Sequence, residues 1–287
     1  MIWVAGCSGM LGRHICEKLS AAGISHTTTD IELDITDLSA VSDFINRNKI
    51  SWIINSSAYT AVDLAEDEKD KAFAVNALGV SNLAAAAKVK GAKLVHFSTD
   101  YVFPGIKEGG YDEDDKTGPE SVYGASKLAG EYEIISAYEK HFIFRISWLY
   151  GPYGKNFVHT MLNLFKERDG LNVVNDQYGS PTYTGELSDF IIQLVKDDSD
   201  KYGVYHFSGE GMTNWYEFAS EIYRLVVKYG LTERKVVIIP VDSSKYPQKA
   251  KRPAYSYMLK DKLYSTFGYR PKNWKETLEE YIKSIKG

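Results

Sequence analysis

The chain has 287 residues, of which 44% are hydrophobic and 25% are charged, and its formal net charge is −4. These values are ordinary for a globular protein and exclude disorder as its main state. A protein that binds nucleic acid needs a basic face, and the sequence contains no basic block. No apolar run reaches the roughly 20 residues that span a bilayer. We therefore expect neither a nucleic-acid partner nor a membrane partner.

The N-terminus and the cysteines indicate the compartment. Residues 1–4, MIWV, lead directly into a glycine-rich loop at Gly6, which leaves no apolar segment for a secretory leader. Cys7 and Cys16 are the only cysteines; they do not make a metal site alone and are not typical of a disulfide framework. We expect a cytoplasmic protein that holds no metal.

Short apolar runs alternate with helical patterns in the first half of the chain. Strands are predicted over residues 2–5, 25–30, 52–55, 94–98 and 142–146. Helical spacing follows the first strand at positions 11, 15, 19 and 22, and further helices are predicted over residues 37–47, 69–88 and 122–138. This alternation predicts an α/β fold of the Rossmann type, with a doubly wound parallel sheet.

The pattern changes after about Trp148, where the segments become shorter, more aromatic and interrupted by prolines. Helices are predicted over residues 156–166, 186–196 and 214–228, and strands over 204–207 and 236–239. We expect a dinucleotide-binding domain over residues 1–150 and a smaller C-terminal substrate-binding lobe over residues 151–287. The boundary is approximate, because the lobe is expected to share elements with the first domain.

The glycines Gly6, Gly9 and Gly12 follow the first predicted strand and precede the first predicted helix. Glycines at this turn let the backbone bend sharply and approach a pyrophosphate, which the N-terminus of the helix attracts with free N–H groups. Three glycines could also form a plain flexible turn. Their position at the first strand-to-helix turn favours a dinucleotide site.

The end of the second predicted strand bears on the choice of cofactor. Asp30 lies 18 residues after Gly12, near the spacing at which a carboxylate binds the ribose of a dinucleotide and repels a 2′-phosphate. Arg13 beside the glycine loop would instead pair with that phosphate. The balance favours NADH over NADPH. Asp34 and Ile35 could flank the adenine, although both Asp30 and Asp34 could simply be turn residues.

Tyr123 and Lys127 are four residues apart in a predicted helix, so their side chains share one helical face. A neighbouring ammonium favours the phenolate and lowers the pKa of a tyrosine, which suits proton transfer to a substrate oxygen. The spacing alone is weak evidence. The helix begins after the fourth predicted strand, on the ligand-binding edge of such a sheet.

Two strand ends could complete a site at this edge. Thr99 and Asp100 follow the fourth predicted strand, where a hydroxyl could bind a carbonyl oxygen that gains negative charge. The alternative is a turn that closes the strand. Small residues after Asn55, at the end of the third strand, would let a cofactor lie across the sheet.

Taken together, these segments resemble the dTDP-4-dehydrorhamnose reductase family of the extended short-chain dehydrogenase/reductase superfamily. The resemblance runs from Met1 to about Tyr281. It rests on residues 6–12, 55–63, 75–76, 98–103, 123–131, 145–151, 156–161, 176–182 and 251–253. The glycine loop and the Tyr-x-x-x-Lys pair are signals of the superfamily, whereas the segments around Asp100, Trp148 and Asp176 are specific to the family.

The resemblance implies the roles of individual residues. Tyr123 donates a proton, Lys127 holds the nicotinamide ribose and lowers the Tyr123 pKa, and Thr99 orients the keto group. Asp100 and Trp148 contact the sugar nucleotide, and Arg252 pairs with its diphosphate. The cofactor is lined by Gly9, Met10, Leu11, Asp30, Asp34, Ile35, Ala58, Tyr59 and Thr60. Some relatives carry a magnesium-linked glutamate at a dimer contact where this chain has His14; a homodimer stays possible.

The implied activity is reduction of the 4-keto group of dTDP-4-dehydro-L-rhamnose by NADH or NADPH. A nucleotide-sugar epimerase, a dehydratase or another 4-reductase on the same fold is the first alternative. Related dehydratases have an Asp-Glu pair where Tyr101 follows Asp100 here, which disfavours dehydration. The second alternative is a non-catalytic dinucleotide-binding subunit, such as the similar β-subunit of methionine adenosyltransferase.

Overall fold

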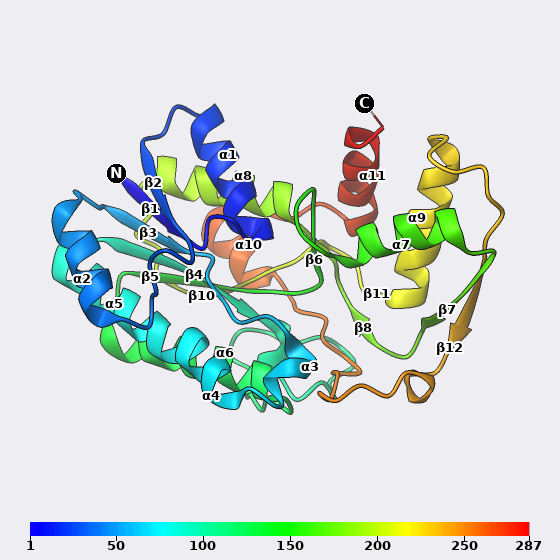
Figure 1. The fold of residues 1–287 in the computed structure, drawn as a ribbon, viewed down its shortest axis with the longest axis horizontal. Helices are drawn as coiled ribbons and strands as arrows, with labels where there is room; N and C mark the ends of the chain where they lie inside the picture. Colours follow the sequence, from blue (N-terminus) through cyan, green and yellow to red (C-terminus); the bar gives the residue numbers. More distant parts are fainter. Residues whose placement is uncertain (287) are drawn as a thin grey trace.

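A six-stranded parallel sheet forms the centre of the protein in the computed structural model, which describes residues 1–286 (Figure 1). The strand order is β2-β1-β3-β4-β5-β10. The strands are β1 (Ile2–Ala5), β2 (His26–Thr29), β3 (Trp52–Asn55), β4 (Lys93–Thr99), β5 (His141–Ile146) and β10 (Gly203–Phe207). The order reverses between β1 and β3, and ligands bind beyond the carboxyl ends of strands at such a reversal. The predicted Rossmann-type fold is confirmed.

Helices cover both faces of the sheet because successive strand residues point to opposite sides. Ile2 and Val4 pack with α1 (Met10–Ala21), α8 (Thr184–Lys196) and α10 (Asp261–Phe267). Trp3 and Ala5 pack on the other face with α2 (Leu38–Arg47), α5 (Gly79–Lys90) and α6 (Val122–Ala137). Strands buried on both faces are continuous apolar runs, which explains the runs in the sequence.

The helix predicted over residues 69–88 is real but interrupted. It begins as α4 (Lys69–Phe73), passes through a π-helical turn (Ala74–Leu78) and continues as α5. Gly91 ends α5 in the left-handed conformation, with φ 65°. Among residues 1–286, one helical stretch, Lys69–Lys90, is long and apolar enough to cross a membrane, but half of its apolar window is buried inside the fold. That burial is typical of a core helix.

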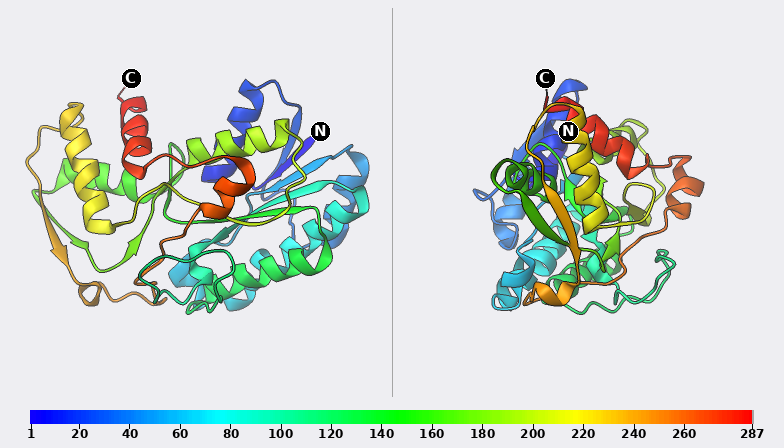
Figure 2. Two further views of the ribbon diagram at one scale, coloured as in Figure 1. Left: turned by 180° about the vertical axis from the view of Figure 1, so that it is seen from behind. Right: turned by 90° about the vertical axis from the view of Figure 1, so that its right-hand side faces the viewer.

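The smaller lobe is built on its own core, formed by α7 (Phe157–Glu167), α9 (Trp215–Lys228) and α11 (Trp274–Ser284). Strand β7 (Gly170–Val174) pairs in parallel with β12 (Val237–Val241) at its outer edge, and Figure 2 shows this lobe beside the sheet. Its remaining short elements are β6 (Leu149–Tyr150), β8 (Tyr178–Gly179), β9 (Thr182–Tyr183) and β11 (Thr213–Asn214). A short helix, α3 (Val62–Ala65), lies near the end of β3.

The two parts exchange chain segments. Helix α8 and strand β10 come from the second half of the sequence, yet α8 packs on α1 and β10 extends the main sheet beside β5. The strand predicted over residues 204–207 therefore belongs to the sheet rather than to the lobe. A division of the chain at residue 150 therefore does not separate the sheet from the lobe.

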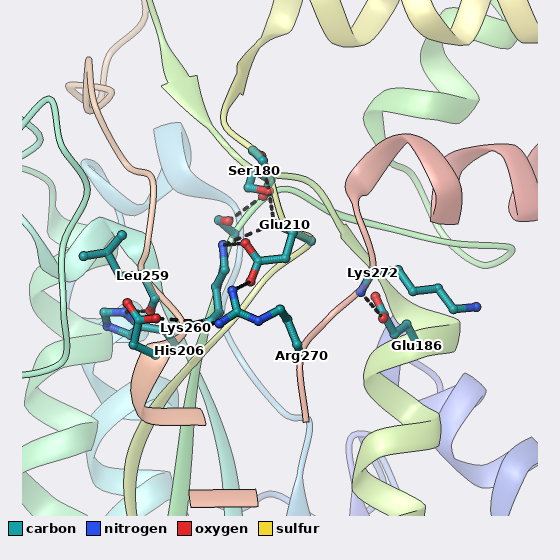
Figure 3. Close-up of polar contacts among 12 residues, drawn as sticks. Ser180, Glu186, His206, Glu210, Leu259, Lys260, Arg270 and Lys272 are labelled. Atoms are coloured by element: carbon teal, nitrogen blue, oxygen red, sulfur yellow. Dashed lines mark hydrogen bonds and ion pairs between the residues drawn. The ribbon is translucent and has the colours of Figure 1, made fainter. Parts of the chain in front are cut away.

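A charged cluster around the buried Lys260 lies where the C-terminal segment returns (Figure 3). Lys260 Nζ lies 3.8 Å from Glu210 Oε2 and 3.3 Å from the Gly209 carbonyl oxygen, and Glu210 also pairs with Arg270 at 3.4 Å. The Lys260 ammonium lies 4.2 Å from the centre of the Tyr257 ring. Burial lowers the pKa of Lys260 to about 8. The cluster fixes the loop after β10 against the C-terminal segment.

Candidate active site

The glycine loop is held in place by backbone packing. Gly6 has φ +76°, and a Cβ atom there would lie 2.6 Å from the Ser57 nitrogen. A Cβ at Gly12 would lie 2.2 Å from the Gly6 carbonyl oxygen. Neither position tolerates a side chain. Gly9 differs: its nearest neighbour would be at 3.4 Å, and the residue lines a cavity. Its missing side chain leaves room for a ligand at the N-terminus of α1.

That cavity has a volume of about 500 Å³ and lies at the carboxyl ends of β1, β3, β4 and β5. Ten predicted site residues line it: Gly9, Met10, Leu11, Ala58, Thr60, Thr99, Asp100, Tyr123, Lys127 and Trp148. The fold therefore brings the glycine loop, the hydroxyl at the end of β4 and the tyrosine and lysine of α6 together from three separate segments of the chain.

Close packing of α6 against the end of β4 positions Tyr123 and Lys127. Ser121 caps α6 by accepting a hydrogen bond from the Gly124 nitrogen at 3.1 Å. A Cβ at Gly124 would lie 2.3 Å from the Tyr101 carbonyl oxygen. Only glycine lets this turn of the helix approach the strand end, and the approach places Tyr123 beside Thr99 in the cavity.

The electrostatics of Tyr123 differ from the sequence-based expectation. Burial raises its pKa to about 12, with a further contribution from the Asp100 carboxylate, while a hydrogen bond with Thr99 acts in the opposite direction. The predicted lowering of the Tyr123 pKa by Lys127 is wrong for this structure. Lys127 Nζ instead donates a hydrogen bond to the Phe97 carbonyl oxygen at 2.6 Å. The phenol is therefore protonated at neutral pH, as a proton donor must be.

The pKa values of Lys127 and Asp100, which also line the cavity, are shifted from their usual ranges as well. Burial lowers the pKa of Lys127 to about 8, against a raising effect of Glu131. Burial raises the pKa of Asp100 to about 6, although hydroxyl hydrogen bonds, including that of Thr99 at 3.0 Å, stabilise its carboxylate. Perturbed groups that converge on one cavity are typical of an active site.

A buried ion pair supports the floor of the site. Arg145 on β5 and Glu131 on α6 are 2.7 Å apart, and their side chains are 6% and 1% exposed. Glu131 also accepts a hydrogen bond from Ser98, the residue before Thr99. Removing one partner of such a pair leaves an uncompensated buried charge. The pair therefore ties α6 to both β4 and β5 directly beneath Thr99 and Lys127.

Several predicted cofactor residues lie outside the cavity lining. The Thr29 carbonyl oxygen, at the end of β2, accepts a hydrogen bond from the Gly6 nitrogen at 2.8 Å, which places Asp30 next to the glycine loop. Asp34 accepts hydrogen bonds from the nitrogen and hydroxyl of Thr36, both at 2.8 Å, which is the turn role. Ile35 is buried against Gly79.

Tyr59 is not part of the cavity lining. Its hydroxyl donates to Glu68 at 2.9 Å, and its backbone nitrogen donates to the Asn76 side chain at 2.9 Å. Asn76 belongs to the π-helical turn and also donates to Ser126 on α6. A π-helical turn contains one residue more than an α-helical turn, and such turns are frequently found at functional sites. Here it lets one side chain join the strand-end loop to the helix that carries Tyr123.

Arg252, which the resemblance pairs with the substrate diphosphate, lies outside the cavity lining. Its guanidinium pairs with Asp63 at 2.6 Å, accompanied by a hydrogen bond to Gln248 at 2.8 Å. It lies 5.9 Å from the centre of the Tyr101 ring, which itself lines the cavity. Arg252 therefore stands behind the cavity wall, held by a carboxylate.

The lobe contributes residues that sequence reasoning missed. Trp215, the first residue of α9, stacks on Trp148 with ring centres 3.7 Å apart, and both line the cavity with Lys155. Trp148 has φ 47°, a left-handed conformation uncommon for a bulky residue. A local signal for Trp215 exists only in the helix cap before it, Asn214, because its partner is 67 positions away in the sequence.

Fold and site together define an extended short-chain dehydrogenase/reductase. The chain belongs to the dTDP-4-dehydrorhamnose reductase family: the family model "RmlD substrate binding domain" matches residues 1–286. A dTDP-4-dehydrorhamnose reductase from Aggregatibacter actinomycetemcomitans is 41% identical over 282 residues, 96% of each chain. The resemblance stated from the sequence is confirmed.

Solved structures agree with this assignment. A dTDP-4-dehydrorhamnose reductase from Clostridium acetobutylicum superimposes with a TM-score of 0.94 at 40% identity, over 100% of this chain and 99% of that one. The enzyme from Bacillus anthracis, in complex with NADP, gives 0.93 at 40% identity over 99% and 98%. A UDP-glucose 4-epimerase from Thermus thermophilus, at 20% identity and TM-score 0.81, shares the fold.

Proposed function

We propose that this protein reduces the 4-keto group of dTDP-4-dehydro-L-rhamnose to the alcohol of dTDP-L-rhamnose, with NADH or NADPH as reductant. The observation that carries the proposal is the convergence of Thr99, Tyr123 and Lys127 with the glycine loop in one cavity. Family membership over the whole described chain supports the substrate.

The residues of the cavity fit a dinucleotide. The open position at Gly9 leaves space for a pyrophosphate at the N-terminus of α1. Ala58 and Thr60 present small side chains beyond β3, and Lys127 would hold the nicotinamide ribose. Asp30 beside the loop favours NADH by repelling a 2′-phosphate, whereas the relative from Bacillus anthracis was solved with NADP. Asp34, Ile35 and Tyr59 would act by shaping this wall.

A bound reduced nicotinamide supplies the hydride that reduces the ketone. Tyr123 carries its proton at neutral pH, and its hydroxyl would protonate the oxygen that gains negative charge. The Thr99 hydroxyl would hold that oxygen in place. Tyr123 lines the cavity beside Thr99, so the phenol would be the source of the proton.

The sugar nucleotide would lie on the lobe side of the cavity. Trp148, stacked on Trp215, offers an aromatic wall, and Asp100 offers a buried carboxyl group to sugar hydroxyls. Arg252 would need to leave Asp63 in order to reach a diphosphate. Lys155, an exposed cation in the cavity lining, would attract the diphosphate without any rearrangement.

The setting proposed for this activity is the cytoplasm, where nucleotide sugars serve the biosynthesis of surface polysaccharides. A homodimer is proposed as the assembly. Nucleic acid and membranes are not partners in this proposal, because the activity needs only small molecules.

The proposal is tested with purified protein, dTDP-4-dehydro-L-rhamnose and each reduced cofactor, by following the loss of nicotinamide absorbance and identifying the product. We expect loss of absorbance in proportion to the alcohol formed. An epimerase recycles its cofactor and would change the sugar without added reductant. A regulatory subunit would bind the cofactor and leave the sugar unchanged.

A further inference from the structure

A buried histidine lies directly beneath Lys127. His96 on β4 stands opposite Asn55 on β3 in the strand register, and the two residues are 0% and 1% exposed. His96 Nδ1 lies 3.1 Å from Asn55 Nδ2, and His96 Nε2 lies 3.4 Å from Lys127 Nζ. The imidazole therefore connects the end of β3 to the lysine of the active site.

The orientation of the Asn55 amide decides which imidazole nitrogen carries the proton. The backbone N–H of Ser57 donates to Asn55 at 2.9 Å, and only the amide oxygen can accept it. The amide NH₂ group must then face His96 and donate to Nδ1. Burial lowers the pKa of His96 well below its usual value, so the ring is neutral. A neutral ring that accepts at Nδ1 carries its proton on Nε2.

This tautomer directs an N–H group at Lys127 Nζ. The neighbours of the ammonium are then an acceptor, the Phe97 carbonyl oxygen at 2.6 Å, and a donor, His96 Nε2–H. A neutral amine satisfies both, because it donates to Phe97 and accepts from His96. Glu131 on the same helix acts against this and raises the pKa of Lys127, although Glu131 is itself paired with Arg145. Hydrogen bonding to the neutral form disfavours the charged form.

We propose that His96 is a positioning residue for Lys127: the Asn55–His96 pair fixes the Nε2–H tautomer, and this tautomer keeps part of the Lys127 population neutral in mildly alkaline solution, so that Lys127 takes up a proton there when the dinucleotide binds. The inference rests on the proposed contact between Lys127 and the cofactor ribose. Lys127 also shares the cavity with Tyr123 and Asp100. Binding a negatively charged cofactor near this cavity favours the ammonium, so cofactor binding takes up a proton.

Calorimetry of NADH or NADPH binding in buffers of different ionisation enthalpy measures this proton directly. With a Lys127 pKa of about 8, we expect uptake of about half a proton per site at pH 8 and almost none at pH 6.5. In His96→Gln the side-chain amide can turn its oxygen towards Lys127. The pH at which half a proton is taken up should then rise by about one unit or more. His141→Gln removes a buried histidine from β5, outside the cavity lining, and should keep the wild-type profile.

The tautomer is measured separately, from ¹⁵N chemical shifts of the His96 ring. We expect Nδ1 without a proton and Nε2 with one between pH 6 and pH 9, a range bracketing the Lys127 pKa of about 8. A protonated Nδ1 overturns the inference, and so does an unshifted uptake profile in folded His96→Gln. Wild-type protein that binds no cofactor, with the Nε2–H tautomer present, would instead count against the proposed function.

Discussion

Two lysines of this protein are buried alike but stand in different surroundings. Lys127 and Lys260 are 2% and 4% exposed, and burial lowers the pKa of each to about 8. Each also has a tyrosine nearby, Tyr123 for the first and Tyr257 for the second. Lys127 lines the cavity, whereas Lys260 joins the loop after β10 to the C-terminal segment. A shifted pKa therefore marks a catalytic group only where a cavity gives substrate access to it.

The largest expected difference between the two regions concerns their tyrosines. We expect Tyr123→Phe to lower kcat by about 10²–10⁴-fold, the usual contribution of a general acid. Tyr257→Phe should retain the wild-type kcat, because its ring contacts Lys260 outside the cavity. Steady-state kinetics of the two variants make the comparison. Wild-type turnover by Tyr123→Phe would remove this residue from the mechanism.

Replacement of the two lysines should affect the affinity for the cofactor differently. Lys127→Met removes the ammonium from the cavity, and we expect the dissociation constant for the cofactor to rise by about tenfold or more, the equivalent of one lost charged hydrogen bond. Lys260→Met should bind the cofactor as the wild type does. Fluorescence titration measures both. An equal rise of the cofactor dissociation constant in the two variants would contradict a specific role of Lys127 in cofactor binding.

The free energy of unfolding should depend on pH because the pKa of Lys260 differs between the folded and unfolded states. Its pKa is about 8 in the folded protein and about 10.4 in an unfolded chain. Between these values the unfolded chain binds more protons, so the free energy of unfolding rises with pH. Relative to Lys260→Met, the wild type should gain about 2 kcal/mol between pH 8 and pH 10. Urea unfolding across this range tests the sign; a flat difference would contradict the burial of a titrating ammonium.

The smallest expected effect lies at the rim of the cavity, next to the glycine loop. We expect Asp30→Ser to raise the ratio of NADPH to NADH efficiency by about tenfold, because a carboxylate that repels a 2′-phosphate is removed. Asp34→Ser is the matched control, since Asp34 accepts hydrogen bonds within its own turn. A ratio that moves equally in both variants would place Asp30 away from the ribose.

Local patterns predicted much of the fold. The glycine loop and the helix after it follow from spacing alone. The place of β10 was not predictable, because an apolar strand does not specify its partner, and here that partner is β5. The π-helical turn was also missed, since it depends on contacts of Asn76 with distant residues.

In the site, too, local sequence predicts some features, whereas others depend on contacts between distant residues. Tyr123, Lys127 and Thr99 were predicted because a helical spacing and a strand end locate them, and the cavity contains all three. The ion pair of Arg252 with Asp63 was not predicted, because the two residues are 189 positions apart in the sequence. The pKa of Tyr123 was predicted in the wrong direction, because burial depends on the whole fold.

Transfer of deuterium tests the central claim most directly. Wild-type protein is given dTDP-4-dehydro-L-rhamnose and a reduced nicotinamide cofactor that carries deuterium at C4 on the transferred face, and the product is analysed by NMR. The account predicts deuterium at C4 of the sugar in wild-type protein, and a slow but identically labelled product in Tyr123→Phe. An unlabelled product, or label at another carbon, would contradict hydride transfer to the 4-keto group in this cavity.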